Sequence, residues 1–201
     1  MTVTTQKISF ADYLKYSDGT NIRYELVEGE LIPMSLGTGI HGGIAEFLND
    51  EFRGQIRQTG LPWTSKQMTV GVRSPRGTRW ETSRIPDVTV LSMAQWEAMA
   101  KREAVINLNE PPPLLVVEVV SPSTRADDYR SKPSEYALLE IPEYWIVDPL
   151  EQIVTVSTLD YRLYDSVEYS GDDNVRSPTF PNINLTAVQI LSCNRGKNLA
   201  S

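Results

Sequence analysis

A run of hydrophobic residues spaced three or four positions apart predicts a long amphipathic helix. The apolar positions begin at Ile40 and end at Ile56, and Gly60 follows them. Residues at this spacing lie on one face of an α-helix. We therefore predict a helix that starts near Thr38 or Gly39, ends before Gly60 and buries one face.

Short runs of β-branched and aromatic residues predict a series of strands. The expected strands are Arg23–Val27, Glu30–Met34, Met68–Val72, Asp87–Leu91, Leu114–Val120, Tyr144–Val147, Ile153–Thr158 and Tyr161–Val167. Shorter helices are expected at Phe10–Leu14, from Ser92 to Met99, over Ser131–Glu140 and near Thr186–Leu191. Residues 73–84 are rich in Gly, Pro, Ser and Arg, which is typical of a loop or hairpin tip.

The segment Leu114–Val120 is apolar at every position except Glu118. A strand of this kind is buried on both faces, as in the centre of a mixed or parallel sheet. The central elements follow the order helix, strand, strand, strand, helix, strand. The expected fold class is therefore α/β, a mixed sheet flanked by helices with an N-terminal hairpin and C-terminal strands added. We expect one domain over residues 1–201.

Composition narrows the classes of chemistry that the chain can perform. It has 201 residues, a formal net charge of −7, one histidine and one cysteine. One cysteine excludes an intramolecular disulfide, and one histidine excludes a zinc site built from several histidines. The sequence contains no Gly-rich phosphate loop of standard spacing. Carboxylates and lysine must therefore carry any catalysis.

The negative charge and the N-terminal segment bear on partners and location. Nonspecific nucleic-acid binding rests on Lys and Arg, so an acidic chain disfavours it, although local patches matter more than totals. The first ten residues lack the apolar core of a signal peptide. No run approaches the ~20 apolar residues of a membrane span. We expect a cytoplasmic protein with no membrane partner.

Glu118 is the most informative single residue. An unpaired carboxylate in an apolar strand is costly to bury, so it must meet a cation, a basic partner or water. Asp87 follows Pro86 and opens a strand of its own. Adjacent strands can bring the two carboxylates to one end of a sheet, where paired oxygen donors suit Mg²⁺. The residues leave two interpretations of Glu118 open: a salt-bridged or edge-exposed glutamate, and a metal ligand or general base at a cleft.

Asp128, Lys132 and Tyr136 follow at steps of four residues. On a continuous helix they would share one face. Pro133 favours a helix that is capped by Ser131 and starts at Lys132, because proline belongs in the first turn. A lysine at a helix start is electrostatically unfavourable unless an anionic group needs it. Lys132 is thus either a functional amine or a solvated surface residue.

These segments resemble the PD-(D/E)xK, or restriction-endonuclease-like, superfamily through Pro86-Asp87 and Glu118. They are more closely similar to a family of putative restriction endonucleases expanded in cyanobacteria. The blocks that carry the resemblance are Tyr-Glu-Leu-Val-Glu-Gly-Glu (24–30), His41, Pro-Asp-Val (86–88), Glu-Val-Val-Ser-Pro-Ser-Thr (118–124), Lys132, and Tyr136 with Pro-Glu-Tyr-Trp-Ile-Val-Asp-Pro (142–149).

The resemblance implies an αβββαβ core and a DNA endonuclease that works as a homodimer. It also implies Mg²⁺ or Mn²⁺ bound by Asp87 and Glu118, with Lys132 as the third catalytic residue. The superfamily places its lysine two residues after the acid, where this chain has Val120. In relatives of this kind the lysine can come from the following helix, and Lys132 occupies that place.

Further residues are expected around this centre. The side chains expected beside the metal ligands are Glu25, His41, Asp128 and Tyr136. The arginines expected to contact nucleic acid are Arg73, Arg76, Arg79, Arg84, Arg125 and Arg130. Two alternatives remain, a catalytically silent nucleic-acid-binding or assembly module on the same fold, and a phosphoesterase with a closed pocket for small substrates.

Overall fold

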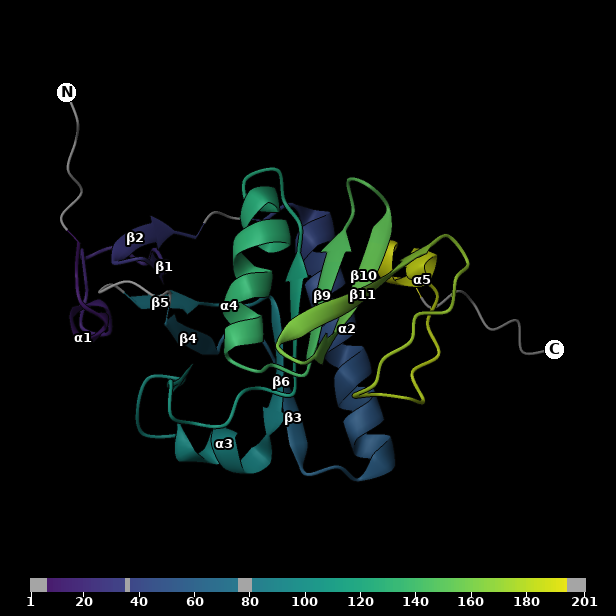
Figure 1. Cartoon of the computed structure of the whole chain (residues 1–201), viewed down its shortest axis with the longest axis horizontal. Helices are drawn as coiled ribbons and strands as arrows, with labels where there is room; N and C mark the ends of the chain where they lie inside the picture. Colours follow the sequence, from purple (N-terminus) through teal and green to yellow (C-terminus); the bar gives the residue numbers. More distant parts are fainter. Residues whose placement is uncertain (1–6, 35–36, 76–80, 195–201) are drawn as a thin grey trace.

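The computed structural model describes residues 7–34, 37–75 and 81–194 (Figure 1). Its helices are α1 (Phe10–Tyr13), α2 (Gly39–Thr59), α3 (Met93–Ala98), α4 (Lys132–Leu138) and α5 (Ala187–Leu191), with a π-helical turn η1 (Asp127–Ser131) before α4. Its strands are β1 (Tyr24–Val27), β2 (Glu30–Pro33), β3 (Trp63–Gln67), β4 (Gly71–Pro75), β5 (Glu81–Arg84), β6 (Val88–Ser92), β7 (Val105–Ile106), β8 (Leu115–Val119), β9 (Glu143–Asp148), β10 (Ile153–Asp160) and β11 (Leu163–Ser170).

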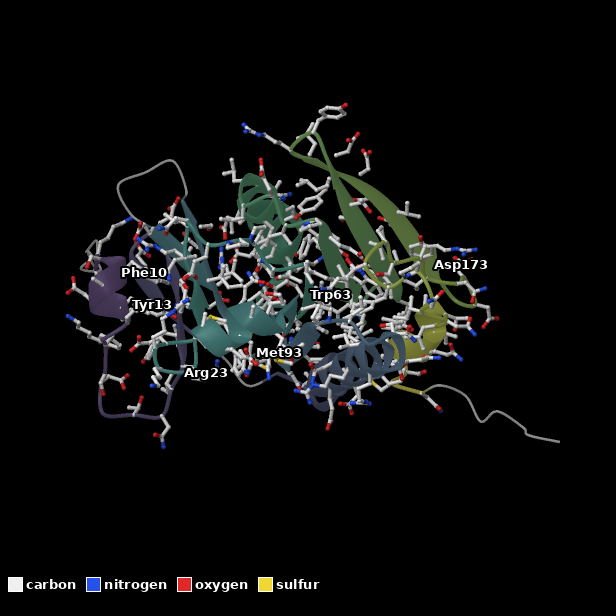
Figure 2. All side chains as sticks on the ribbon, turned by 90° about the horizontal axis from the view of Figure 1, so that it is seen from below. Phe10, Tyr13, Arg23, Trp63, Met93 and Asp173 are labelled. Atoms are coloured by element: carbon white, nitrogen blue, oxygen red, sulfur yellow. The ribbon has the colours of Figure 1, made fainter. Side chains whose placement is uncertain are left out.

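The strands form two mixed sheets. The central sheet has the order β11-β10-β9-β8-β6-β3, and the N-terminal sheet has the order β2-β1-β5-β4-β7. In Figure 1 the N-terminal sheet and α1 lie at the left of the view, and the central sheet fills the middle. Figure 2 shows the same division, with Phe10 and Tyr13 at one end of the molecule and Asp173 near the other. The α/β fold with a mixed sheet flanked by helices is confirmed.

Strand β8 lies at the centre of the central sheet, between antiparallel β6 and parallel β9. All five of its residues are buried, Glu118 among them. Val117 belongs to the core beneath α2 and α5, whereas Val116 packs with Tyr136 of α4. The central sheet is thus covered on both faces, which explains why the sequence of β8 is nearly all apolar.

Helix α2 follows the hydrophobic pattern of its sequence. The hydroxyl of Thr38 caps its first turn, and Gly60 ends it in the left-handed conformation with φ 67°. Its buried face includes Phe52, which lies edge-on to Trp145 at 5.6 Å and stacks on Phe180 at 5.0 Å between ring centroids. Full burial of such a side chain contributes about 1.5–3 kcal/mol, so this face anchors α2 to the central sheet.

The turn η1 accommodates a proline at the start of α4. The N–H of Lys132 donates to the carbonyl of Asp127, five residues earlier. Pro133 has no N–H to continue this pattern, and the hydroxyl of Tyr144 donates instead to the carbonyl of Asp128 at 2.9 Å. Ser131, expected as a cap, makes no side-chain cap hydrogen bond, because α4 follows directly on η1. The α-helix itself covers Lys132–Leu138 and is shorter than the expected Ser131–Glu140.

Two segments differ from the sequence-based assignments. Residues 73–84, expected as a loop or hairpin tip, include the end of β4 and all of β5, which pair as an antiparallel hairpin. Residues 68–72 do not form one strand, because Met68 has φ 46° and β4 starts at Gly71. Within the described ranges, no helix is long and apolar enough to cross a membrane.

Candidate active site

Asp87 and Glu118 lie opposite each other at one end of the central sheet. Val88 pairs with Val117 in the antiparallel register of β6 and β8, so one step further places Asp87 opposite Glu118. Residues directly opposite in antiparallel strands project from the same face. The N–H of Val119 donates to Asp87 Oδ2 at 2.7 Å, and the exposed fractions of Asp87 and Glu118 are 6% and 3%. The structure therefore brings the two carboxylates together.

Both carboxylates line a cavity of about 530 Å³ between the two sheets. The N-terminal sheet contributes Glu25 and Arg84, α2 contributes His41, and the start of α4 contributes Lys132. The rest of the wall includes the loop from Ser121 to Thr124. A cavity of about 610 Å³ between α4 and the β10–β11 hairpin is lined by none of the three proposed catalytic side chains.

Both carboxylate oxygens of Glu118 have donors on α4. The hydroxyl of Tyr136 donates to Oε1 at 2.6 Å, and Lys132 Nζ lies 2.8 Å from Oε2. Burial raises the pKa of Glu118 to about 8, and the positive charge of Lys132 opposes this rise. Glu118 is therefore a buried acid whose charged form depends on a neighbouring cation.

Lys132 lines the cavity and contacts two acids. Its amine also donates to Asp128 Oδ1 at 2.7 Å. Burial by itself lowers the pKa of Lys132, but attraction to Glu118 and Asp128 reverses this effect and raises it, so the amine is charged. The second oxygen of Asp128, Oδ2, is buried without a hydrogen-bond partner among the described residues. Burial raises the pKa of Asp128, and Lys132 again opposes the rise.

His41, near the start of α2, faces the other acid of the pair. Its Nε2 lies 3.4 Å from Asp87 Oδ2. The hydrogen bond to Asp87 raises the pKa of His41, and burial works against it. Thr38 Oγ1 accepts the backbone N–H of His41 at 3.3 Å, which fixes the first turn of the helix beside Asp87.

Arg84 occupies the interior of the site, although the sequence suggested a nucleic-acid contact. Its exposed fraction is 1%. Nε and Nη2 donate to the two oxygens of Glu135 at 3.0 and 3.1 Å, and Nη1 lies 3.2 Å from Glu25 Oε2 and 3.7 Å from Asp127 Oδ2. Arg84 is therefore a buried side chain with three carboxylate partners and not part of an exposed basic loop, and its contact with DNA stays a prediction.

The other arginines differ in their surroundings. Arg73 forms an ion pair with Glu81 and lies over the ring of Phe10, 4.0 Å from its centroid. Arg125 lies 2.9 Å from a carboxylate oxygen of Glu151. Arg130 is exposed on η1. Arg76 and Arg79 lie outside the described residues. Arg73 and Arg125 thus already have carboxylate partners, and their contact with nucleic acid stays a prediction.

The sequence did not point to Glu135 as part of this site. The residue is three positions after Lys132 on α4, and residues at this spacing share a helix face. That spacing is the one sequence feature that connects Glu135 with Lys132, since an acidic residue on a helix is usually exposed to solvent. Its partner Arg84 lies in a segment expected as a loop or hairpin tip, so the sequence does not indicate that the two residues pair.

The donor set fits a magnesium ion better than a zinc ion. In the part of the chain that the structure describes, no three His, Cys, Asp or Glu side chains gather so as to hold a metal. Zinc sites need three or four protein ligands, whereas Mg²⁺ takes one or two carboxylates and keeps several waters. The carboxylates that line the cavity also outnumber Arg84 and Lys132; they are Glu25, Asp87, Glu118 and Asp127.

Comparison with known proteins assigns the chain to a family. The model of the Uma2 family, described as a putative restriction endonuclease, matches residues 10–188. A crystal structure of a putative nuclease belonging to DUF820 from Anabaena variabilis is similar, with a TM-score of 0.69 and 19% identity over 92% of this chain and 98% of that chain. No curated protein matches the sequence. The structural likeness shows the fold, and the family match over most of the chain confirms the resemblance: the chain belongs to the Uma2 family of putative restriction endonucleases.

Proposed function

We propose that the chain is an endonuclease that hydrolyses DNA phosphodiester bonds in the cavity between the two sheets. The observation that supports this most is the grouping of Asp87, Glu118 and the Lys132 amine in one cavity. Family membership supports the reaction class. The two carboxylates would hold Mg²⁺ or Mn²⁺, which when bound polarises a phosphodiester and lowers the pKa of a bound water.

The charged amine of Lys132 is the group of the chain best placed to meet a phosphate. An ammonium in a water-poor site stabilises negative charge that develops on the phosphoryl oxygens. Lys132 has two partners, Glu118 at 2.8 Å and Asp128 at 2.7 Å. Asp128 therefore holds the amine when Glu118 turns to the cation, and the buried ammonium is never left without a counter-charge.

Neighbouring side chains would orient the two acids. His41 and the N–H of Val119 contact the same oxygen of Asp87, at 3.4 and 2.7 Å. Tyr136 holds Oε1 of Glu118 at 2.6 Å. Hydrogen bonds of this kind fix the direction of a ligand's lone pairs and tune metal affinity. Glu25 acts one step further away, through its contact with Arg84.

One specific feature favours the alternative of a silent nucleic-acid-binding module. Both oxygens of Glu118 already have donors, Tyr136 and Lys132, so a cation must compete with the amine. In a silent module this ion pair would simply persist.

The test is nicking of supercoiled plasmid with Mg²⁺ or Mn²⁺ by the wild type, Asp87→Ala and Glu118→Ala. We expect nicking by the wild type alone and its loss when EDTA removes the metal. Equal cleavage by both variants would reject the mechanism. Plasmid binding without cleavage under any metal would favour the silent module.

We also propose that the endonuclease works as a homodimer. Each chain carries one Asp87–Glu118 pair and therefore one proposed metal site. Cleavage of both strands of a duplex needs two such sites, which a symmetric dimer would supply. Sedimentation velocity of the wild type tests this directly. A monomer at working concentrations would restrict the proposal to nicking of one strand at a time.

A further inference from the structure

One buried guanidinium links the N-terminal sheet to α4. Arg84 ends β5, and it forms two parallel hydrogen bonds with Glu135 of α4 at 3.0 and 3.1 Å. Its remaining nitrogen lies 3.2 Å from Glu25 of β1. Both Arg84 and Glu135 are 1% exposed. The contact therefore ties the two walls of the cavity together in a geometry that permits little movement.

Stability alone gives a weak reason for this arrangement. Desolvation of two charges offsets most of their attraction, and well-packed apolar residues of similar volume often serve as well or better. Fork-to-fork pairing of arginine with a carboxylate instead gives defined geometry. A buried pair of this kind beside the candidate active site thus suggests a role in fixing positions.

Glu135 connects the pair to the catalytic amine. It is three residues after Lys132 on α4, and side chains at this spacing project from the same helix face. The first turn of α4 lacks a backbone donor at Pro133, so side-chain contacts replace part of its backbone bonding. The hydrogen bonds from Arg84 to Glu135 therefore act on the same helix face, and near the same turn, as Lys132.

The same guanidinium acts on the segment that leads to Asp87. Glu25 Oε1 accepts the N–H of Ile85 at 2.8 Å while its other oxygen faces Arg84. This contact fixes the chain two residues before Asp87. Arg84 thus contacts two parts of the site. Through Glu25 it acts on the segment before Asp87, and through Glu135 it acts on α4, which carries Lys132.

We propose that Arg84 and Glu135 are positioning residues whose buried pair holds the Lys132 amine between Glu118 and Asp128. Their effect on cleavage rests on the proposed nuclease function, but their effect on the position of the amine does not. Loss of the pair leaves α4 folded on the central sheet through Tyr136 and lets its first turn shift.

The test is a ¹H–¹⁵N NMR spectrum of the lysine ammonium groups, assigned with Lys132→Met. A buried, hydrogen-bonded ammonium exchanges slowly with water and gives a resolved signal. We expect this signal in the wild type and its loss or shift in Glu135→Gln and Arg84→Lys. Arg102→Lys, at the half-exposed ion pair of Arg102 with Glu110 at 2.6 Å, is the matched control and should leave it unchanged.

An unchanged signal in folded Glu135→Gln and Arg84→Lys would overturn the proposal. So would loss of the folded state in both variants by circular dichroism, because the pair would then serve stability. If the wild type nicks plasmid, both variants should lose about 10–100-fold in kcat, and Glu135→Gln, which leaves the contact of Arg84 with Glu25 in place, should keep KM and Mn²⁺ affinity close to wild type. A wild type without nuclease activity whose Lys132 signal still depends on the pair would refute the nuclease and leave the positioning role intact.

Discussion

Lys132 Nζ lies 2.8 Å from Glu118 Oε2, although the two residues come from different elements, α4 and β8. Val120, two residues after Glu118 and just past the end of β8, is buried in the core beneath α4. Side chains two residues apart in an extended chain project to the same side, so Glu118 and Val120 share one face. The amine that α4 supplies thus reaches Glu118 on the face of the central sheet that α4 covers.

The role of Lys132 is tested with Lys132→Met, which keeps an unbranched side chain one atom shorter and removes its charge. We expect nicking to be lost while Asp87 and Glu118 still bind Mn²⁺, measured by isothermal titration. In EDTA the variant should lose about 3–5 kcal/mol of unfolding free energy, because Glu118 and Asp128 lose their buried partner. Addition of Mn²⁺ should restore part of this loss in urea titrations. Wild-type nicking by Lys132→Met would show that the amine takes no part in the reaction.

The metal ligands are tested with Glu118→Gln and Asp87→Asn, which preserve shape and remove charge. We expect each to weaken Mn²⁺ binding by more than about tenfold, since hard cations need charged oxygen ligands. Asp172→Asn, at an exposed aspartate of the C-terminal region, is the matched control and should bind like the wild type. Unchanged Mn²⁺ affinity in both site variants would place the metal elsewhere.

Most of the central sheet could be predicted because its patterns are local, whereas its edge strand β3 at Trp63–Gln67 was missed. The apolar run of β8, the spacing of Ile44, Leu48 and Phe52 on α2, and the Ser92 cap of α3 each specify one element without knowledge of its neighbours. Asp87 and Glu118 could be paired because each lies at the end of a strand assigned in this way.

In the N-terminal sheet, the hairpin of β1 and β2 could be predicted from its local pattern, but its pairing with β5, β4 and β7 could not, because long-range contacts create it. Strands β4 and β5 carry polar residues, Ser74 and Ser83 among them, that are buried only once the hairpin of these two strands pairs with β1 and β7. Arg84 therefore looked like part of a basic surface loop. Its carboxylate partners Glu25 and Glu135 are far away in sequence, so its burial had no local signal.

The hydrogen bond between Tyr136 and Glu118 is tested with Tyr136→Phe. Loss of a buried donor at 2.6 Å should cost about 1–3 kcal/mol of unfolding free energy. Tyr161→Phe, at a side chain that is 95% exposed, is the matched control and should change little. Equal stability of both variants in urea titrations would mean that this contact contributes nothing to the site.

The packing of α2 on the central sheet is tested with Phe52→Ala. The ring is buried between Trp145 and Phe180, so its removal should cost about 3–5 kcal/mol. Leu163→Ala, on the edge strand β11 at 74% exposure, should stay within about 0.5 kcal/mol of the wild type. A loss of similar size at both positions, measured by thermal unfolding, would contradict the described core.

The most direct measurement is an anomalous difference map from crystals of the wild type soaked in Mn²⁺. We expect one strong peak within coordination distance of both the Asp87 and the Glu118 carboxylates, with the Lys132 amine still held by Asp128. A map without a peak between these two acids, in which Lys132 and Glu118 keep their ion pair, would contradict the metal site on which the proposed nuclease depends.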